Sequence, residues 1–153
     1  MPHVVSAYLH NVLTPGRLNQ TVKRTIRLIA RSGVKFDAIA FRGMSGALIA
    51  PQVASHFSVP LLMIRKNKNN SHSGLTVEGK AVKKYIIVED CISSGKTMEI
   101  IVDAVRRFGE YNGGWSKDDI KCQGIFLYSP SEGEYKYWYY DIAANDEGIR
   151  VYC

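Results

Sequence analysis

Two adjacent carboxylates, Glu89 and Asp90, directly follow the apolar run Tyr85 to Val88, and a small hydroxyl-rich loop then enters a helical stretch. Backbone N–H groups at the start of that helix, with the hydroxyls of Ser93, Ser94 and Thr97, can bind a phosphate, which the helix dipole also favours. The acid pair would repel this phosphate and suits sugar hydroxyls or a hydrated magnesium ion instead. A phosphorylated ribose carries both kinds of group, so the segment predicts a ribose phosphate site.

Two other interpretations of this segment were weighed. Gly95-Lys96-Thr97 is also how a nucleotide-triphosphatase P-loop ends, but that motif needs a glycine five residues before Gly95, and position 90 is Asp. The other alternative is an ordinary strand-to-helix turn with acids on the surface. The combination of acid pair, small loop and helix start favours a ligand site over such a turn.

Polar residues follow two earlier apolar runs in the same way. Arg42 and Gly43 come directly after Phe41, and Arg65 and Lys66 come directly after Ile64. In parallel sheets a ligand lies beyond the carboxyl ends of the strands. We therefore expect these residues to lie near the acid pair.

The apolar patterning predicts the elements that must position these residues. Thr14-Pro15 begins and Ser32-Gly33 ends a helical pattern in which Leu18, Val22, Ile26 and Ile29 share one face. Further helices are expected at Ala47 to Phe57 and Thr97 to Phe108. The expected strands are Phe36 to Phe41, Val59 to Ile64, Tyr85 to Val88 and Gln123 to Tyr128, followed by the short Tyr135 to Ile142 and Ile149 to Tyr152.

Alternation of strands and helices predicts an α/β fold, a single domain over residues 1–153 whose mostly parallel central sheet is flanked by helices. Arg65 to Lys83 is polar and is expected to be a long mobile loop, a feature that is usually functional. Gly109 to Lys117 is expected to be a turn.

Composition limits the class of protein. Hydrophobic residues make up 46% and charged residues 22% of the chain, as in soluble globular proteins, and no apolar run approaches a membrane span. Met1 to Asn11 lacks a secretory pattern, and the three cysteines are expected to be reduced thiols, which together favour a cytoplasmic protein. The net charge of +6 favours anionic partners. The cations of the first helix, including Lys23, Arg24, Arg27 and Arg31, are interpreted as a solvated face rather than a nucleic-acid surface.

The acid-pair segment resembles the PRPP (5-phosphoribosyl 1-pyrophosphate) binding motif of type I phosphoribosyltransferases, and Val88-Glu89-Asp90 with Gly95-Lys96-Thr97-Met98 is particularly similar to the hypoxanthine-guanine members. The resemblance implies that Glu89 and Asp90 hold the ribose hydroxyls and Mg²⁺. It implies that Arg42 and Gly43 face pyrophosphate, and that Arg65 and Lys66 start a catalytic loop of the kind found in orotate-type members. The residues that it places on the 5′-phosphate are Ser93, Ser94, Gly95, Lys96 and Thr97.

The C-terminal part should form a small hood that recognises the base, and here the sequence departs from the family. Tyr128 stands where 6-oxopurine enzymes carry a Lys, and Ser93 stands where they carry an Asp. Tyr128 and Ile149 are the candidate base contacts. The resulting prediction is a homodimeric enzyme of nucleotide salvage that transfers phosphoribosyl from PRPP to a nitrogenous base, with purine favoured. The alternative is a PRPP-sensing regulator that binds nucleic acid.

Overall fold

The computed structural model describes residues 3–6, 9–66, 74–130, 137–138 and 148–153. The helices are α1 (Pro15–Ser32), α2 (Gly43–Ala47), α3 (Ala50–Phe57) and α4 (Lys96–Gly113), with a 3₁₀ turn at Lys117–Asp119. The strands are β1 (Ala38–Arg42), β2 (Leu61–Ile64), β3 (Val77–Gly79), β4 (Lys84–Glu89), β5 (Lys121–Leu127), β6 (Tyr137–Trp138) and β7 (Ile149–Tyr152). Among these helices, none has the length and apolar character that a membrane crossing requires.

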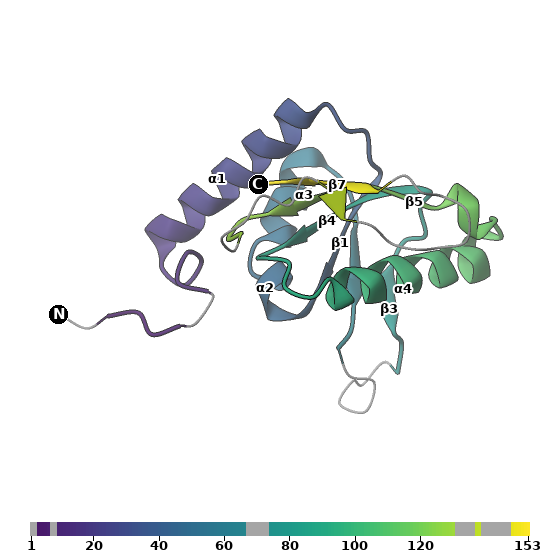
Figure 1. Cartoon of the computed structure of the whole chain (residues 1–153), viewed down its shortest axis with the longest axis horizontal. Helices are drawn as coiled ribbons and strands as arrows, with labels where there is room; N and C mark the ends of the chain where they lie inside the picture. Colours follow the sequence, from purple (N-terminus) through teal and green to yellow (C-terminus); the bar gives the residue numbers. More distant parts are fainter. Residues whose placement is uncertain (1–2, 7–8, 67–73, 131–136, 139–147) are drawn as a thin grey trace.

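The strands form one sheet in the order β3-β2-β1-β4-β5-β7-β6 (Figure 1). The β1–β2, β1–β4, β4–β5 and β5–β7 pairs are parallel, whereas β3 and β6 run antiparallel to their neighbours. This confirms the predicted mostly parallel α/β sheet. The described residues of the expected hood extend the sheet as β6 and β7, and the rest of that segment lies outside the described residues.

Alternating strand residues face two separate cores because successive side chains of a strand point to opposite faces. Ile87 and Ile125 pack beneath α4, whereas Ile86 and Phe126 pack beneath α1 and α3. The helices therefore cover the sheet on both faces, and they leave the carboxyl ends of β1, β2 and β4 together at one edge.

One predicted loop and one predicted helix are corrected. The stretch Arg65 to Lys83 is not loop throughout, because Val77–Gly79 forms β3 against β2, with Val77 opposite Ile64. Residues 67–73 of that stretch lie outside the described residues. The helix predicted from Ala47 to Phe57 begins at Ala50 instead, as α3, and Ala47 ends a separate short helix, α2.

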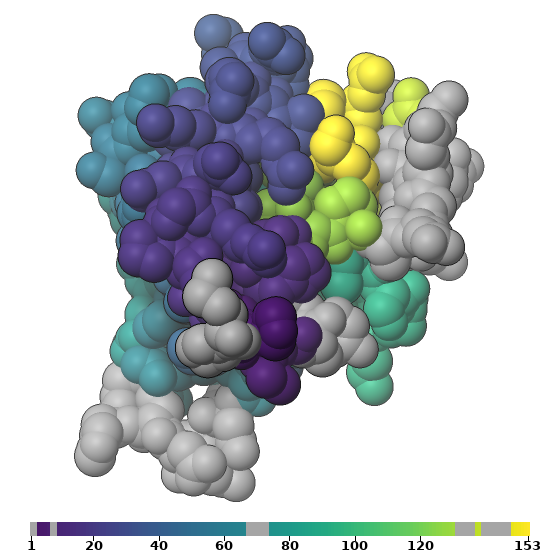
Figure 2. Space-filling model, turned by 90° about the vertical axis from the view of Figure 1, so that its left-hand side faces the viewer, coloured from purple at the N-terminus to yellow at the C-terminus, as the bar shows by residue number. Residues whose placement is uncertain are grey.

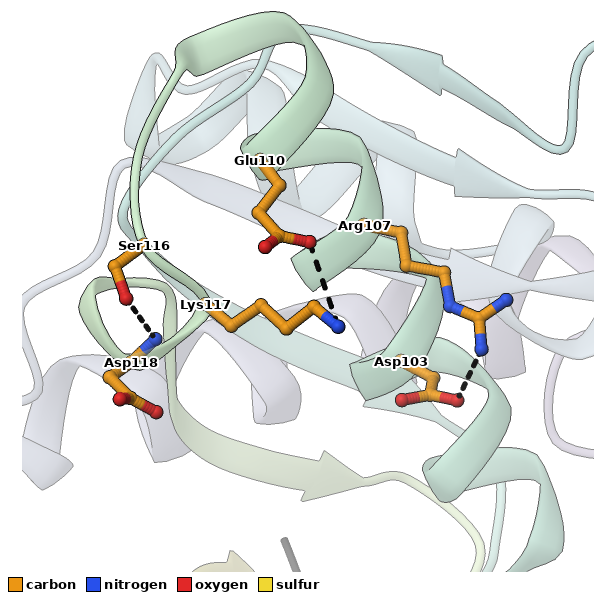
Figure 3. A network of polar contacts seen from close by, with 6 residues as sticks. All are labelled: Asp103, Arg107, Glu110, Ser116, Lys117 and Asp118. Carbon is orange, nitrogen blue, oxygen red and sulfur yellow. Dashed lines mark hydrogen bonds and ion pairs between the residues drawn. The ribbon is translucent and has the colours of Figure 1, made fainter. Parts of the chain in front are cut away.

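The predicted turn from Gly109 is partly helix. α4 continues to Gly113, and the chain then turns at Gly114, whose φ is 68°. Figure 3 shows how polar side chains hold this end of the helix: Lys117 pairs with Glu110 at 3.7 Å, and the Ser116 hydroxyl accepts from the Asp118 N–H at 3.4 Å. Exposed contacts of this kind each contribute little to stability.

Candidate functional site

The ends of β1 and β2 meet at Gly43 and Lys66. Gly43 has a φ of 76°, in the left-handed region that glycine tolerates without strain. A Cβ atom at this position would overlap the Lys66 side chain, with the Lys66 Nζ only 3.0 Å away. The sequence-predicted pair is therefore brought into contact, and the lysine lies directly over the turn that follows β1.

Glu89, at the end of β4, lies beneath the same turn. Its side chain is 2% exposed, and its two oxygens accept hydrogen bonds from the Arg42 N–H at 2.7 Å and the Ser45 hydroxyl at 2.8 Å. Burial raises the pKa of Glu89 to about 7; the two hydrogen bonds oppose this rise, and the neighbouring Asp90 charge adds to it. The side chain therefore stabilises the turn after β1 from below.

Asp90 has a different environment. It is half-buried, and its Oδ1 accepts from the N–H of the next residue, Cys91, at 2.8 Å. In the following loop Ser93, Ser94 and Lys96 are exposed, whereas Gly95 is buried with a φ of 82°. The first turn of α4 follows directly, so its N–H groups and the serine hydroxyls are available to an anion.

The carboxylates fit magnesium that is bound together with a phosphorylated ligand. Mg²⁺ usually takes one or two carboxylates and completes its shell with water and substrate phosphates. Asp90 has one oxygen that is not engaged by the Cys91 N–H, whereas both Glu89 oxygens accept hydrogen bonds from the protein. Among the described residues no group of three or more acidic, histidine or cysteine side chains forms a ready-made metal site. Asp90 is thus the better placed of the two predicted metal ligands.

The three predicted cations are placed differently. Arg65 forms an ion pair with Glu78 of β3 at 2.8 Å, which directs it to the β2–β3 hairpin. Lys66 lies over Gly43, as described above. The Nε of Arg42 is buried and has no hydrogen-bond acceptor among the described residues. A buried donor without an acceptor is costly, so this position suits an anionic ligand.

The two predicted base contacts are packed within the fold. Tyr128 is 1% exposed, and its hydroxyl donates to the Ser45 carbonyl at 2.7 Å. Ile149 pairs with Trp138 across β6 and β7 and packs against the core beneath α4. This geometry does not favour a contact between the Tyr128 phenol and a base. Sequence reasoning missed that Ser45 links Tyr128 to Glu89, because neither residue is near Ser45 in the chain.

A basic groove runs along α1, beside the end of β5 and the C-terminal strand, on the face that Figure 2 shows. It has a volume of about 820 Å³, and exposed arginines line its rim. Arg24 does not belong only to a solvated face, as the sequence predicted, since its guanidinium donates to the Tyr128 carbonyl at 2.6 Å. The lining arginines are Arg17, Arg24, Arg27 and Arg31.

Comparison with known proteins gives consistent similarities. A sequence profile of the family described as phosphoribosyl transferase domain matches residues 17–110. The chain is 28% identical over 129 residues to uridine 5′-monophosphate synthase of Bos taurus, covering 75% of this chain and 26% of that protein. It is 31% identical over 115 residues to orotate phosphoribosyltransferase of Methanothermobacter thermautotrophicus, covering 66% and 62%. The chain thus spans less than two thirds of the length of either relative.

Solved structures show the same fold at low identity. Orotate phosphoribosyltransferase from Aeropyrum pernix matches with a TM-score of 0.60 and 15% identity, covering 80% of this chain and 64% of that one. Adenine phosphoribosyltransferase from Thermoanaerobacter pseudethanolicus matches with a TM-score of 0.54 and 16% identity, covering 77% and 71%. Orotate phosphoribosyltransferase of Mycobacterium tuberculosis in complex with PRPP matches with a TM-score of 0.52 and 15% identity, covering 79% and 64%. These likenesses confirm the fold that the sequence predicted.

Proposed function

This chain belongs to the phosphoribosyl transferase domain family, and we propose from that premise that it transfers the 5-phosphoribosyl group of PRPP to a nitrogenous base. The observation that carries the proposal is the meeting of three strand ends. Lys66 lies over Gly43, and Glu89 accepts from Arg42 beneath it. Cations, an acid pair and a helix start are thereby gathered at one edge of the sheet, as a ligand with two phosphorylated ends requires.

Each part of the site has a role in this proposal. The exposed Ser93 and Ser94 and the first N–H groups of α4 bind the 5′-phosphate, whose charge the helix dipole favours. Asp90 binds the ribose hydroxyls. Arg42 and Lys66 bind the pyrophosphate and stabilise the negative charge that develops as it leaves.

Magnesium fits the same proposal as a partner of the substrate. Asp90, with Glu89 once it is released from the Arg42 N–H and the Ser45 hydroxyl, would hold the ion, which would neutralise part of the pyrophosphate charge. Transfer then consists of forming a bond from the ribose C1 to a base nitrogen while the bond from C1 to pyrophosphate oxygen breaks, and the proton of that nitrogen leaves to the departing pyrophosphate or to water. The protein contributes mainly by positioning and electrostatic stabilisation.

For the acceptor base we propose a pyrimidine of the orotate type. Several curated relatives are orotate enzymes, which favours a pyrimidine over the purine that the sequence motif favoured. The packed position of Tyr128 gives no support to a purine contact at that residue. The homodimer predicted from the resemblance stays a prediction, which sedimentation velocity would test.

The test is an assay of pyrophosphate release with PRPP, Mg²⁺ and each of orotate, uracil, hypoxanthine, guanine and adenine. We expect orotate to give the fastest release, and the Asp90→Asn variant to give none above background. Lys121→Glu, an exposed position at the start of β5 and at the other end of the sheet, is the matched control. Release that is independent of any base, or equal in Asp90→Asn and wild type, would contradict the proposal.

A second function, binding of nucleic acid by the same domain, is favoured by the arginine-lined groove on α1. No aromatic residue lines the described groove, so its arginines would bind mainly phosphates, and contacts to phosphates carry no sequence information. Reversing Arg27 and Arg31 to Glu should then abolish binding to single-stranded DNA and leave transfer unchanged, whereas reversing Lys84 and Lys121 should affect neither. Absence of salt-dependent binding by the wild-type protein would exclude this second function.

A further inference from the structure

Trp138 of β6 lies against Gly95, the residue that ends the loop after the acid pair. A Cβ atom built on Gly95 would lie 2.5 Å from the Trp138 Nε1, and its next nearest neighbours, at 3.4 and 3.5 Å, are the indole Cδ1 and Cε2. The edge of the five-membered ring therefore covers the glycine, which is buried while Ser93, Ser94 and Lys96 are exposed.

The position of Trp138 is set by strand pairing at the C-terminal side of the sheet. Trp138 pairs with Ile149 across β6 and β7, and β7 lies parallel to β5 with Ile125 opposite Val151. The indole also packs against the core beneath α4. A side chain more than forty positions later in the chain is thus held on the loop by the sheet, and not by the loop's own sequence.

The contact with Trp138 matters more for the conformational order of Gly95 than it would for another residue type. Its φ of 82° lies in the left-handed region, and glycine loses more conformational freedom on ordering than any other residue. The start of the loop is held independently, by the Ser129 N–H on the Asp90 carbonyl and by the buried Ile92 side chain. The exposed Ser93 and Ser94 have a local bond, from the Lys96 N–H to the Ser94 hydroxyl at 3.3 Å. Without the indole, the ligand would have to supply more of the order of this second half of the loop, at a cost in affinity.

We propose that Trp138 is a positioning residue for the phosphate-binding loop, which it holds ready for the 5′-phosphate by covering Gly95. The inference rests on the proposed function for the identity of the ligand. The inference itself is that β6 and β7 hold the loop through Trp138. A phosphorylated ribose that binds at the loop therefore changes the surroundings of the indole.

The first experiment uses fluorescence. The chain has two tryptophans, and Trp115 lies beyond the other end of α4, an 18-residue helix about 27 Å long. In Trp115→Phe the emission reports Trp138 alone. We expect ribose 5-phosphate, and PRPP with Mg²⁺, to change this emission, with a midpoint equal to the dissociation constant from calorimetry on the same variant.

The two possible failures are distinguishable. If calorimetry detects no binding of PRPP with Mg²⁺, the proposed function fails. If calorimetry detects binding but the Trp138 emission stays constant, the proposed function stands and the role of Trp138 is overturned.

The second experiment separates positioning from a merely structural role. We expect Trp138→Ala to raise the KM for PRPP about tenfold while kcat changes less than about twofold, because the lost order is restored once the ligand is bound. Trp138→Phe should recover most of the affinity, since a ring again covers Gly95. Trp115→Ala is the matched control and should leave the KM unchanged. An unchanged KM in a folded Trp138→Ala, or a loss confined to kcat, would overturn the inference; if Trp138→Ala does not fold, the fluorescence result decides.

Discussion

The turn after β1 and the loop after β4 are neighbours at the candidate site, and they differ in how far their polar groups are engaged by the rest of the protein. The first is held by contacts from distant parts of the chain: Glu89 accepts from Arg42 and Ser45, and Tyr128 donates to the Ser45 carbonyl. In the second, the side-chain hydrogen bonds are short-range, such as the Cys91 N–H to Asp90, and the contacts from distant parts of the chain reach its two ends: the Asp90 carbonyl accepts from the Ser129 N–H at 2.8 Å, and Trp138 covers Gly95. The turn after β1 is therefore fixed by hydrogen bonds before a ligand binds, whereas the loop after β4 presents exposed polar groups that a ligand can engage.

This difference separates two carboxylates that the sequence treats alike. Glu89 is 2% exposed and has both oxygens occupied, whereas Asp90 is half-buried with one oxygen free of the Cys91 bond. Replacing each in turn should therefore affect different properties: Asp90 the ligand, and Glu89 the stability of the fold.

The largest expected effect is that of Asp90→Asn on activity. Loss of this charge removes the carboxylate that we propose as ligand of magnesium and of the ribose hydroxyls, and we expect kcat/KM for PRPP to fall by at least about 100-fold. The free energy of unfolding, measured in urea, should change by less than about 1 kcal/mol, because the side chain is half-buried and its hydrogen bond is to the adjacent residue, Cys91. If Asp90→Asn were instead so destabilised that unfolding explained its lost activity, Asp90 and Glu89 would not differ in the way proposed.

Next in size is the effect of Glu89→Ala on stability. The substitution leaves the half-buried Arg42 N–H and Ser45 hydroxyl without their acceptor, and we expect the free energy of unfolding to fall by about 3 kcal/mol. Glu89→Gln, which keeps an acceptor for the Arg42 N–H, is the matched control and should lose much less. Equal losses in Glu89→Ala and Asp90→Ala, measured in urea, would show that the turn is not held in this way.

Stability should also depend on pH through Glu89. Because burial raises the pKa of this carboxyl to about 7 in the folded protein, from 4.5 when exposed, the folded state binds the proton more tightly than the unfolded chain does. The contribution of Glu89 to the free energy of unfolding is therefore greatest below about pH 4.5. It falls as the pH rises to about 7, by an amount on the order of 3 kcal/mol.

The check is a series of urea unfolding curves of the magnesium-free protein between pH 5 and 8, with Glu89→Gln beside the wild type. The difference in unfolding free energy between the two proteins should shift in favour of Glu89→Gln as the pH rises. A difference that does not change with pH would mean that Glu89 is not the group that titrates.

Sequence patterns predicted the parts of this molecule that depend on local contacts. The apolar runs before Arg42, Arg65 and Glu89 became three adjacent parallel strands, and the periodic stretch from Pro15 to Ser32 became α1. β3 was missed because it is only three residues long and Val77 is its only buried member, so pairing with β2 defines it.

The inward position of Glu89 was missed for a similar reason. Its two hydrogen-bond donors lie 47 and 44 positions earlier in the chain, and no local pattern indicates that they meet. The inward orientation of Tyr128, in contrast, could have been predicted from the sequence. It is two positions after Phe126 and so lies on the same face of the strand, the face covered by α1 and α3.

The smallest expected effect tests whether Tyr128 stabilises the turn after β1 or lines a base pocket. Tyr128→Phe keeps the buried ring and removes the hydrogen bond to the Ser45 carbonyl, so the free energy of unfolding should fall by about 1 kcal/mol. The ratio of orotate to hypoxanthine turnover should stay within about twofold of the wild type, because a buried phenol that is bonded to the backbone has no group to offer a base. A residue that hydrogen-bonds the base would change this ratio by tenfold or more, since its loss leaves a polar group of one substrate unpaired. A changed ratio of orotate to hypoxanthine turnover with unchanged stability would therefore indicate that Tyr128 contacts the base. It would mean that the turn after β1 moves when substrate binds.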